Sequence, residues 1–516
     1  MKLKFAKLAC FITVFCVATA FAAPRKTYTV VTGFDPTQGS NPVGPLAQGL
    51  DGNLYGMTET GGNSNALCPA GGTEGSGCGS LFKVTPAGQL TTIYEFCSLA
   101  SCADGAVPLG GLLLATNGNF YGITSIGGAN NHGTVFQIAP TGTLTTLYSF
   151  CSLANCADGS NPTGTLIQAA NGNLFGTTNK GGAHQSSTCK PTGSVVGCGT
   201  IFEITTTGQL TTFYSFCSLA NCADGALPVT PLTQATDGNL YGSTTGGGLA
   251  NKLCGPTGCG TVFQITPTGT LTTLHQFCSQ GGTCSDGAGP DTALVQVGDN
   301  MIGTAGNIFS ITLSGNLTVL LSGLKAVEGF TVATDGSIYG VTFNGGTNNT
   351  FCSNGTSTCG TIFKMSSTGG FGTLYSFCQD GTTGSCPTGA LPVVGLMQAT
   401  NGNLYGTTFF GGPTVNVACN ATGNAGCGTV WSASLGIPPF VQAVSNFGRA
   451  GYGVTLLGNN LTGTTGVTFN GTPAAFSVVS DTELIAKVPT GATTGTIQVT
   501  TPTGTLNSNV AFQVLP

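Results

Sequence analysis

The stretch Asn239-Leu240-Tyr241-Gly242, followed by Gly260-Thr261-Val262-Phe263, decides the fold of this chain because both halves recur along the sequence. Copies of the first half occur at 53–56, 119–122, 173–176, 337–340 and 403–406, with a weaker copy at 300–303. The spacing of these seven copies, about 40 to 65 residues, is typical of a repeat architecture in which each unit is one supersecondary element.

Each repeat contains four short β-type runs, which in the fourth repeat are 227–235, 239–245, 260–266 and 270–277. Asp237-Gly238 separates the first two runs and Pro267-Thr268-Gly269 separates the last two, and both patterns are typical of tight turns. The other connections are long and vary in length. Four antiparallel strands per repeat predict the blade of a β-propeller, and seven copies predict seven blades.

The last repeat has three strands, at 390–399, 403–410 and 428–433, and no fourth strand before Ile437. An extra run, 26–34, precedes the first repeat and aligns with the fourth strand at 271–277. We therefore expect residues 26–34 to complete the last blade and to close the ring, which removes exposed sheet edges.

The propeller is expected to span 23–435, with one weak point at 291–322. This fifth repeat lacks cysteines and has a shortened connection between its second and third strands. It is either a lean blade or a failed one.

Residues 1–22 have the pattern of a cleaved signal peptide. Lys2, Lys4 and Lys7 precede an apolar run at 8–20, and 20–22 offers a small-x-small cleavage site. No other apolar run approaches the ~20 residues of a membrane span. A secreted or cell-surface protein is expected, with no membrane span in the mature chain.

Composition narrows the range of partners. Without residues 1–22, ten Lys/Arg remain against 18 Asp/Glu, a net charge of about −8. Charged residues make up only 6% of the chain and form no basic run, so nucleic-acid binding lacks its electrostatic signature. The hydrophobic content of 40% is that of a folded protein rather than a disordered one. We expect a monomer.

Twenty cysteines follow the signal peptide, and they fall into ten close pairs that we expect to be disulfides. Five pairs precede the third strand of a repeat: Cys68/Cys78, Cys189/Cys198, Cys254/Cys259, Cys352/Cys359 and Cys419/Cys427. Five follow the fourth strand: Cys97/Cys102, Cys151/Cys156, Cys217/Cys222, Cys278/Cys284 and Cys378/Cys386. Zinc sites are the alternative, but no pair has C-x-x-C spacing and the chain has only three His. Each small disulfide loop would contribute about 2 kcal/mol.

After Ser434 the repeat ends, and Ile437-Pro438-Pro439 leads into a different pattern. Short alternating runs occur at 453–461, 467–471, 483–489, 495–500 and 510–514. Such runs, with turn signals between them, predict an immunoglobulin-like β-sandwich over 437–516.

Two families are similar to these patterns. The repeat, with its Asn-Leu-Tyr-Gly and Gly-Thr-Val-Phe motifs, resembles the GloVer-type tandem repeat of secreted bacterial proteins over about 26–434. The tail resembles an IPT/TIG domain on Gly453 to Leu461, Val467 to Gly471 and Val488-Pro489. The resemblance implies a bacterial extracellular protein and implies no particular activity.

The alternation of connections gives the predicted propeller two different faces. The tight turns all lie on one face, which we call the plain face. The long connections, with all ten cysteine pairs, lie on the other face, which we call the stapled face. Long loops on a rigid scaffold are where binding sites usually occur, although staples also protect such loops from proteolysis.

Four aspartates recur on the stapled face, each after the second cysteine of a pair and before a glycine: Asp104, Asp158, Asp224 and Asp286. A ring of carboxylates could bind Ca²⁺ or a hydroxyl-rich ligand, and no other cofactor is predicted. In the simpler alternative each is an Asp-Gly turn whose carboxylate caps its own backbone. These four residues are the candidate ligand-binding residues.

Other residues carry weaker signals. His132 and His184 lie in long connections of neighbouring repeats and could form a metal pair. Glu59, Glu74 and Glu328 do not recur, as expected either for specialised residues or for surface drift. No nucleophile elbow, His-Glu-x-x-His, P-loop or dinucleotide motif occurs, so we name no catalytic residue.

His275 and Trp431 are expected to be packing variants, because they replace a Tyr of the fourth strand and a Phe of the third strand.

Three functions remain open. The preferred one is a non-catalytic binding protein whose stapled face recognises an extracellular glycan or protein, with the sandwich as a spacer or second binding module. The alternatives are a polysaccharide hydrolase or lyase, which acidic residues at the channel mouth would favour, and a passive envelope or matrix component.

Overall fold

The computed structural model describes residues 26–516 except 65–66, 69–76, 187–188, 190–196, 251, 280–282, 325–326, 347–351, 353–357, 380–385 and 414–425. The predicted signal peptide, Glu74 and Cys419 lie outside the described residues, so the signal peptide stays a prediction. Within the described residues no helix has both the length and the apolar character needed to cross a membrane.

Seven antiparallel four-stranded sheets form the blades of a β-propeller, as the repeats predicted. Blade one contains β2 (Ser40–Gln48), β3 (Leu54–Thr60), β4 (Ser80–Val84) and β5 (Leu90–Glu95). Blade two contains β6 (Leu113–Leu114), β7 (Phe120–Thr124), β8 (Thr134–Ile138) and β9 (Leu144–Ser149). Blade three contains β10 (Ser160–Gln168), β11 (Leu174–Lys180), β12 (Thr200–Ile204) and β13 (Leu210–Ser215). Blade four contains β14 (Thr233–Gln234), β15 (Leu240–Thr244), β16 (Thr261–Ile265) and β17 (Leu271–Gln276). Blade five contains β18 (Val295–Val297), β19 (Asn300–Thr304), β20 (Ile308–Thr312) and β21 (Leu317–Leu321). Blade six contains β22 (Val327–Val332), β23 (Ile338–Thr342), β24 (Thr361–Met365) and β25 (Phe371–Ser376). Blade five is therefore a complete, lean blade.

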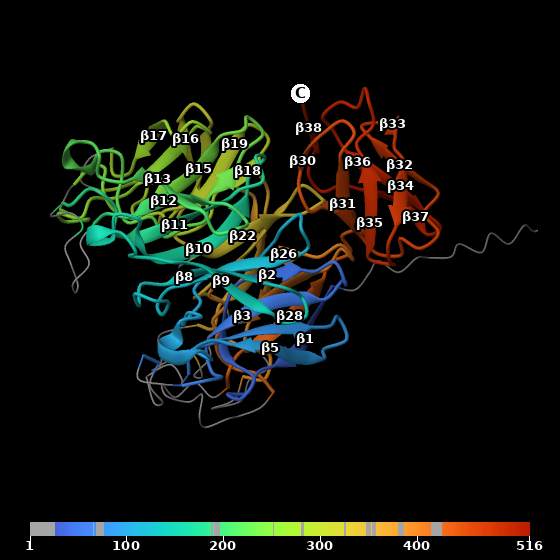
Figure 1. Cartoon of the computed structure of the whole chain (residues 1–516), viewed down its shortest axis with the longest axis horizontal. Coiled ribbons are helices and arrows are strands. Elements are labelled where there is room, and N and C mark those ends of the chain that lie inside the picture. Colours follow the sequence, from blue (N-terminus) through green and yellow to red (C-terminus); the bar gives the residue numbers. More distant parts are fainter. Residues whose placement is uncertain are drawn as a thin grey trace, which may run out of the picture.

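Blade seven joins the two ends of the repeat region. It contains β26 (Met397–Gln398), β27 (Leu404–Thr408) and β28 (Thr429–Ser434), and its fourth strand is β1 (Thr27–Gly33). Strand β1 runs antiparallel to β28, from Thr27 opposite Ser434 to Gly33 opposite Thr429. Figure 1 shows β1 in blue close to β28 in orange. The ring is closed by the N-terminal strand, as predicted.

The repeated motif has a packing cause. In blade four Gly242 of the second strand lies directly opposite Phe263 of the third strand. A Cβ on Gly242 would lie 2.6 Å from Cζ of Phe263, so only glycine leaves room for the phenyl ring of Phe263 to lie over the second strand. In blade seven Trp431 covers Gly406 in the same way and is fully buried, which confirms its predicted packing role.

In five of the seven blades, the tight turn between the first two strands also holds a tyrosine. Asp237 Oδ1 accepts a hydrogen bond from the Asn239 amide (3.0 Å), and Oδ2 accepts one from the Tyr241 hydroxyl (2.7 Å). In blade two Asn117 takes this place and donates its amide to the Tyr121 hydroxyl (2.8 Å). Asp and Asn are exchangeable here because both fix the turn and engage the tyrosine.

Glutamines on the innermost strands clamp neighbouring blades together, a feature that the sequence analysis missed. Gln48 of blade one accepts a hydrogen bond from the Thr400 amide of blade seven (2.9 Å) and donates to the Thr400 hydroxyl (3.0 Å). Four further glutamines reach the preceding blade in the same way: Gln168, Gln234, Gln296 and Gln398. In the sequence these contacts could have been suspected because a glutamine recurs three residues before the Asp or Asn of the tight turn.

The sandwich follows the propeller, in red in Figure 1. One sheet contains β29 (Gln442–Ala443), β31 (Gly453–Leu457), β35 (Glu483–Lys487) and β34 (Phe476–Val478), and the other contains β33 (Thr472–Pro473), β32 (Gly466–Phe469), β36 (Ile497–Thr501) and β37 (Gly504–Asn507). Strands β30 (Phe447–Arg449) and β38 (Gln513–Leu515) form a parallel pair. Leu456, Leu484, Val499 and the Phe469–Phe512 ring contact fill the core between the sheets.

The sandwich is docked on the plain face rather than held away from it. Asn459 donates to the Thr400 hydroxyl (2.7 Å), Thr482 donates to the Leu50 carbonyl (2.6 Å), and Gln513 donates to the Thr236 carbonyl (3.0 Å). These acceptors belong to tight turns of blades seven, one and four. The sandwich is therefore fixed against the propeller, and its role as a spacer or second binding module stays a prediction.

Candidate functional site

The central channel has two ends with different surroundings. On the plain side, a cavity of about 340 Å³ is lined by the innermost strands of blades one, two, six and seven and by sandwich residues that include Gln442, Val444 and Leu457. On the stapled side, a cavity of about 540 Å³ is lined by propeller residues alone. The sandwich thus covers one end of the channel, and the stapled end is the mouth.

Prolines align the seven blades at the mouth. In six blades a proline at the start of the innermost strand packs against the glycine before the third strand of the preceding blade. At the ring closure, a Cβ on Gly428 would lie 2.6 Å from Cδ of Pro42. In blade six Val327 takes the proline's place, since it pairs with Thr342 as Pro42 pairs with Thr58. The seven residues that directly follow this position, one in each blade, therefore occupy equivalent places around the channel.

These equivalent residues all line the mouth, and we call them the mouth ring: Val43, Leu109, Thr163, Val229, Asp291, Glu328 and Val393. Five are neutral. The two carboxylates stand next to each other around the ring, in blades five and six. The mouth ring is therefore neutral except on the side formed by blades five and six.

The two carboxylates differ in protonation. Burial, and then the neighbouring Asp291, raise the pKa of Glu328 to about 7. Asp291 is exposed to solvent, yet the surrounding channel wall partly desolvates its carboxylate and raises its pKa. The Thr304 hydroxyl donates a hydrogen bond to its Oδ1 (2.9 Å) and opposes the shift. Near neutral pH the protonated and the charged form of Glu328 are therefore both accessible, so the side chain can donate or accept a hydrogen bond.

The sequence had singled out Glu328 as unrepeated but had not placed it beside Asp291. Glu59, the second unrepeated glutamate, lines the same cavity from the end of β3. Asp291 was missed because its equivalence to Val43 depends on the proline packing between blades.

The four recurring aspartates are buried in their own loops. Asp158 Oδ2 accepts hydrogen bonds from the Tyr148 hydroxyl (2.8 Å), the Ser152 amide (2.9 Å) and the Ser152 hydroxyl (3.0 Å), and Oδ1 accepts one from the Leu153 amide (3.2 Å). Asp104 and Asp224 have the same four donors, and short 3-10 turns follow at η1 (Ala100–Cys102), η2 (Ala154–Cys156) and η4 (Ala220–Cys222).

These contacts favour the alternative in which each carboxylate caps its own backbone. A ligand-binding role for the four aspartates stays a prediction, and a ligand would have to compete with four donors. In the fourth loop His275 takes the place of the tyrosine and its Nε2 lies 3.0 Å from Asp286 Oδ2. His275 is thus a polar replacement as well as the packing variant that we expected.

Nine of the ten predicted cysteine pairs are disulfides in the structure: Cys68–Cys78, Cys97–Cys102, Cys151–Cys156, Cys189–Cys198, Cys217–Cys222, Cys254–Cys259, Cys278–Cys284, Cys352–Cys359 and Cys378–Cys386. Cys427 is also disulfide-bonded, and its predicted partner Cys419 lies outside the described residues.

The two disulfides of a blade lie side by side on the stapled face. Cys189 Sγ lies 3.8 Å from Cys217 Sγ, and Cys254 Sγ lies 3.7 Å from Cys278 Sγ. The four sulfurs of each set are close enough to surround a metal ion. They do not suit one while they are paired, because a metal requires thiolates.

The metal pair of His132 and His184 stays a prediction. His132 Nδ1 lies 3.1 Å from the Ser160 hydroxyl, and burial lowers its pKa. His184 is exposed in its own loop. Among the described residues, no cluster of three or more metal-binding side chains contains both.

Family comparisons agree with this architecture. The model of the Gloeobacter/Verrucomicrobia repeat matches residues 67–307 and 190–417, and the model of the IPT/TIG domain matches residues 439–514. No curated protein matches the chain.

Several solved structures are similar to this chain at low identity. The extracellular domain assigned to a hybrid two-component system from B. thetaiotaomicron has 14% identity and a TM-score of 0.46, over 95% of this chain and 55% of that chain. A gluconolactonase from Xanthomonas campestris has 12% identity and a TM-score of 0.36, over 62% of this chain and 87% of that chain. At these scores the likeness says nothing about the activity of this chain.

Proposed function

Because the chain belongs to the Gloeobacter/Verrucomicrobia repeat family and ends in an IPT/TIG domain, we propose that it is a non-catalytic extracellular binding protein whose channel mouth recognises a glycan. The observation that carries the proposal is the pair Asp291 and Glu328 in a mouth ring that is otherwise neutral. Disulfides on every blade except the fifth agree with an extracellular location, because they persist under oxidising conditions.

The mouth combines the two surfaces that a sugar needs. Val43, Leu109 and Val229 offer an apolar wall to the C–H faces of a pyranose ring. Asp291 accepts hydrogen bonds from hydroxyl groups, and Glu328 either accepts or donates one. The cavity of about 540 Å³ has room for a short oligosaccharide end.

A glycan array on the full mature chain tests this proposal, with Asp291→Asn and Glu328→Gln as near-isosteric variants. We expect binding to weaken about tenfold or more in each, because a charge-assisted hydrogen bond is lost. Asp299→Asn is the matched control, since Asp299 is an exposed carboxylate on the tight turn of blade five, on the plain face. Unchanged binding in both mouth variants would exclude the mouth as the site.

The same assays include Ca²⁺ and EDTA. Oxygen ligands from Asp291, Glu328 and Thr304 are of the type that Ca²⁺ prefers, which keeps calcium as the one cofactor that we propose. Asp158→Ala and Asp224→Ala test the earlier prediction for the recurring aspartates. A protein ligand remains the alternative binding partner, and a mouth that binds neither class would favour a passive structural role.

A polysaccharide hydrolase or lyase is the second candidate, and one observation favours it. Glu328 with its pKa near 7 beside a second carboxylate is the arrangement that general acid catalysis uses. Turnover of a polysaccharide panel, lost in Glu328→Gln and falling as Glu328 ionises above pH 7, would favour the enzyme. Saturable binding without turnover would favour the binding protein.

A further inference from the structure

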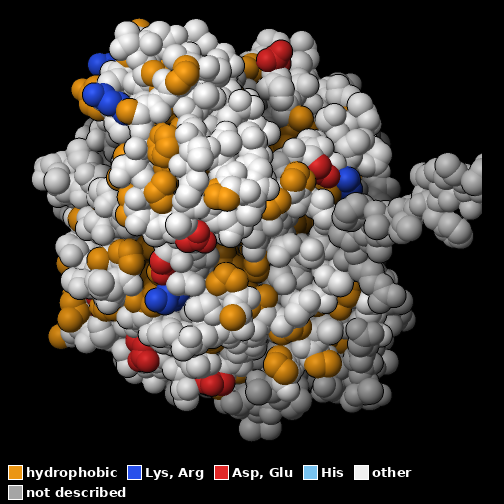
Figure 2. Space-filling model, turned by 90° about the vertical axis from the view of Figure 1, so that its right-hand side faces the viewer, with side chains coloured by type: hydrophobic (Ala, Val, Ile, Leu, Met, Phe, Trp, Pro, Cys, Tyr) orange, Lys and Arg blue, Asp and Glu red, His pale blue; other side chains and the backbone are white. Residues whose placement is uncertain are grey.

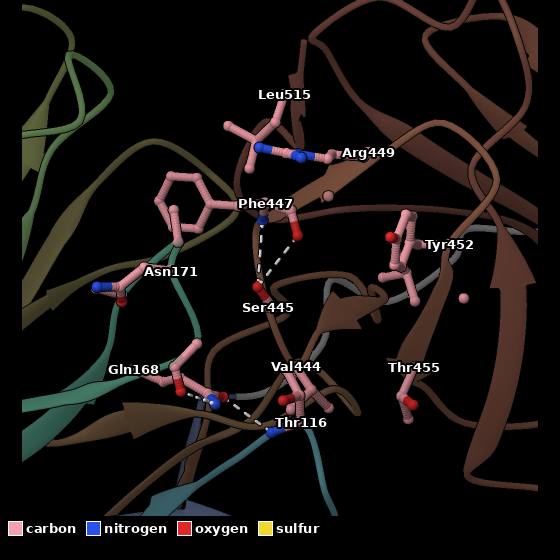
Figure 3. A pocket seen from close by; sticks show the side chains of 16 residues that line it. Thr116, Gln168, Asn171, Val444, Ser445, Phe447, Arg449, Tyr452, Thr455 and Leu515 are labelled. Carbon is pink, nitrogen blue, oxygen red and sulfur yellow. Dashed lines mark hydrogen bonds between the residues drawn. The ribbon is translucent and has the colours of Figure 1, made fainter. Parts of the chain in front are cut away.

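A groove of about 460 Å³ lies between the propeller and the sandwich, away from the mouth. Blade three contributes its tight turn at 168–172, and the sandwich contributes residues 444–455. Figure 3 shows Arg449, Phe447 and Tyr452 on the sandwich side, facing the side of Gln168 and Asn171. Two tight turns from different parts of the chain therefore form opposite walls.

The propeller wall is held in place by its own contacts. The Gln168 amide oxygen accepts a hydrogen bond from the Thr116 amide (2.9 Å), and its nitrogen donates to the Gly172 carbonyl (2.9 Å). Asn171 donates to Glu203 (2.9 Å), which also accepts from Asn173 (2.6 Å). These polar groups are engaged before any ligand arrives, so this wall supplies shape.

The sandwich wall is a turn that presents two side chains. The Tyr452 amide donates to the Arg449 carbonyl (3.2 Å), and the Val488 amide donates to the Tyr452 carbonyl (2.9 Å). Arg449 is the only arginine in the described part of the chain, and its side chain is exposed. Neither of the two ion pairs found among the described residues involves it, and Lys and Arg side chains are few and scattered on the face shown in Figure 2.

Tyr452 supplies an aromatic surface beside this cation. Its exposure of 67% is the highest among the large hydrophobic side chains described as exposed. The groove thus offers a guanidinium fork and an open aromatic ring at the two ends of one turn. A guanidinium binds a carboxylate through two parallel hydrogen bonds, and a tyrosine ring packs on the C–H face of a sugar.

We propose that this groove is a second binding site, which takes an acidic saccharide with its carboxylate on Arg449 and its pyranose ring on Tyr452. This site is separate from the mouth and does not depend on the function proposed there. The volume suits one or two sugar residues.

Titration of the full mature chain with a galacturonic acid trisaccharide, followed by calorimetry, tests the proposal. We expect Arg449→Ala to weaken binding about tenfold or more, and Arg449→Lys to restore only part of it because a lysine cannot form the fork. Tyr452→Ala should weaken binding as well. Lys252→Ala, which removes an exposed cation on the stapled face, should leave it unchanged.

Comparison ligands test which chemical group of the saccharide binds Arg449. The neutral galactose trisaccharide should bind at least about tenfold more weakly than the acidic one, since it lacks the charged partner. Equal affinity for both, or binding that survives Arg449→Ala, would overturn the proposal. A sulfated galactose that binds through Arg449 while galacturonate does not would overturn the carboxylate assignment.

Two further variants separate this site from the mouth. Asp291→Asn and Glu328→Gln should leave galacturonate binding unchanged if the groove is the site. Loss of galacturonate binding in these variants, with Arg449→Ala unaffected, would move the acidic ligand to the mouth and reject the groove.

Discussion

The stapled face carries carboxylates in two settings. Asp104, Asp158 and Asp224 recur in consecutive loops, are fully buried, and each accept four hydrogen bonds from the loop around them. Asp291 and Glu328 occur once each, line the channel mouth, and have pKa values raised by desolvation. Asp291 accepts a hydrogen bond from Thr304, and no hydrogen bond joins Glu328 to a described residue.

The difference separates scaffold from candidate site. A residue copied into many blades does what every blade needs, and here it holds the long loop in one conformation. A residue that departs from the repeat at an equivalent position is free to serve one place on the ring. In this propeller the exceptions to the repeat therefore carry more functional information than the repeat itself.

The largest effect should come from removing a recurring aspartate. Asp158→Ala leaves the buried amides of Ser152 and Leu153 without their acceptor, at a cost of about 3 kcal/mol in the free energy of unfolding. Chemical denaturation measures the change. If Asp158→Ala were as stable as the wild type, the recurring aspartates would not be needed to hold their loops in place.

A smaller effect should appear as a pH dependence at the mouth. Glu328 has a higher pKa in the folded protein than in the unfolded chain, so the folded state binds more protons between about pH 4.5 and 7. Stability should therefore fall as pH rises through this range and then level off. We expect a fall of about 2 kcal/mol, less than the full shift would give, because solvent screens the partly exposed side chain. Denaturation of Glu328→Gln beside the wild type checks this, because the variant should lack most of the slope.

Removing one donor from a recurring aspartate should cost less than removing the acceptor. Tyr148→Phe deletes one of four hydrogen bonds to Asp158 and should destabilise by about 1 kcal/mol. Burial raises the pKa of Tyr148 to about 12, so the hydroxyl stays a donor at all ordinary pH values. The same denaturation assay applies, and a cost equal to that of Asp158→Ala would mean that the tyrosine bond dominates the loop.

The smallest effect on stability should come from neutralising the two carboxylates of the mouth ring. Near pH 4.5, Asp291→Asn and Glu328→Gln should change the free energy of unfolding by less than about 1 kcal/mol, because neither carboxylate holds a loop in place and Glu328 is still protonated at this pH. A destabilisation as large as that of Asp158→Ala would erase the distinction between scaffold and site. Melting temperatures of both variants, compared with Asp299→Asn, provide the measurement.

Much of the fold could be predicted from local patterns. Asn239 to Gly242 and its copies marked the second strand of each blade, since turn chemistry and the glycine opposite Phe263 are set within one repeat. The missing fourth strand of the last blade and the extra strand at 26–34 together predicted the ring closure.

Contacts between blades and domains could not be predicted in the same way. The place of Asp291 in the mouth ring depends on prolines packing against the preceding blade, and the glutamine clamps join residues such as Gln48 and Thr400. The sequence placed the four aspartates on the stapled face and offered backbone capping as the simpler alternative, but it did not identify the tyrosine and serine donors. The docking of the sandwich depends on single hydrogen bonds that leave no pattern.

The closing strand also sets an order of events during folding. Tyr28 of β1 donates to the Thr388 carbonyl, 360 positions away, and stacks on the Tyr375 ring. Strand β1 precedes the rest of the propeller in the chain, so it must wait for nearly all of the propeller before it finds these partners. Until then β28 has an open edge, and the turns that receive the sandwich belong to an unclosed ring. Ring closure is therefore expected to be the late, slow step of folding, and the sandwich, which follows the propeller in the chain, is expected to dock on a ring that has already formed.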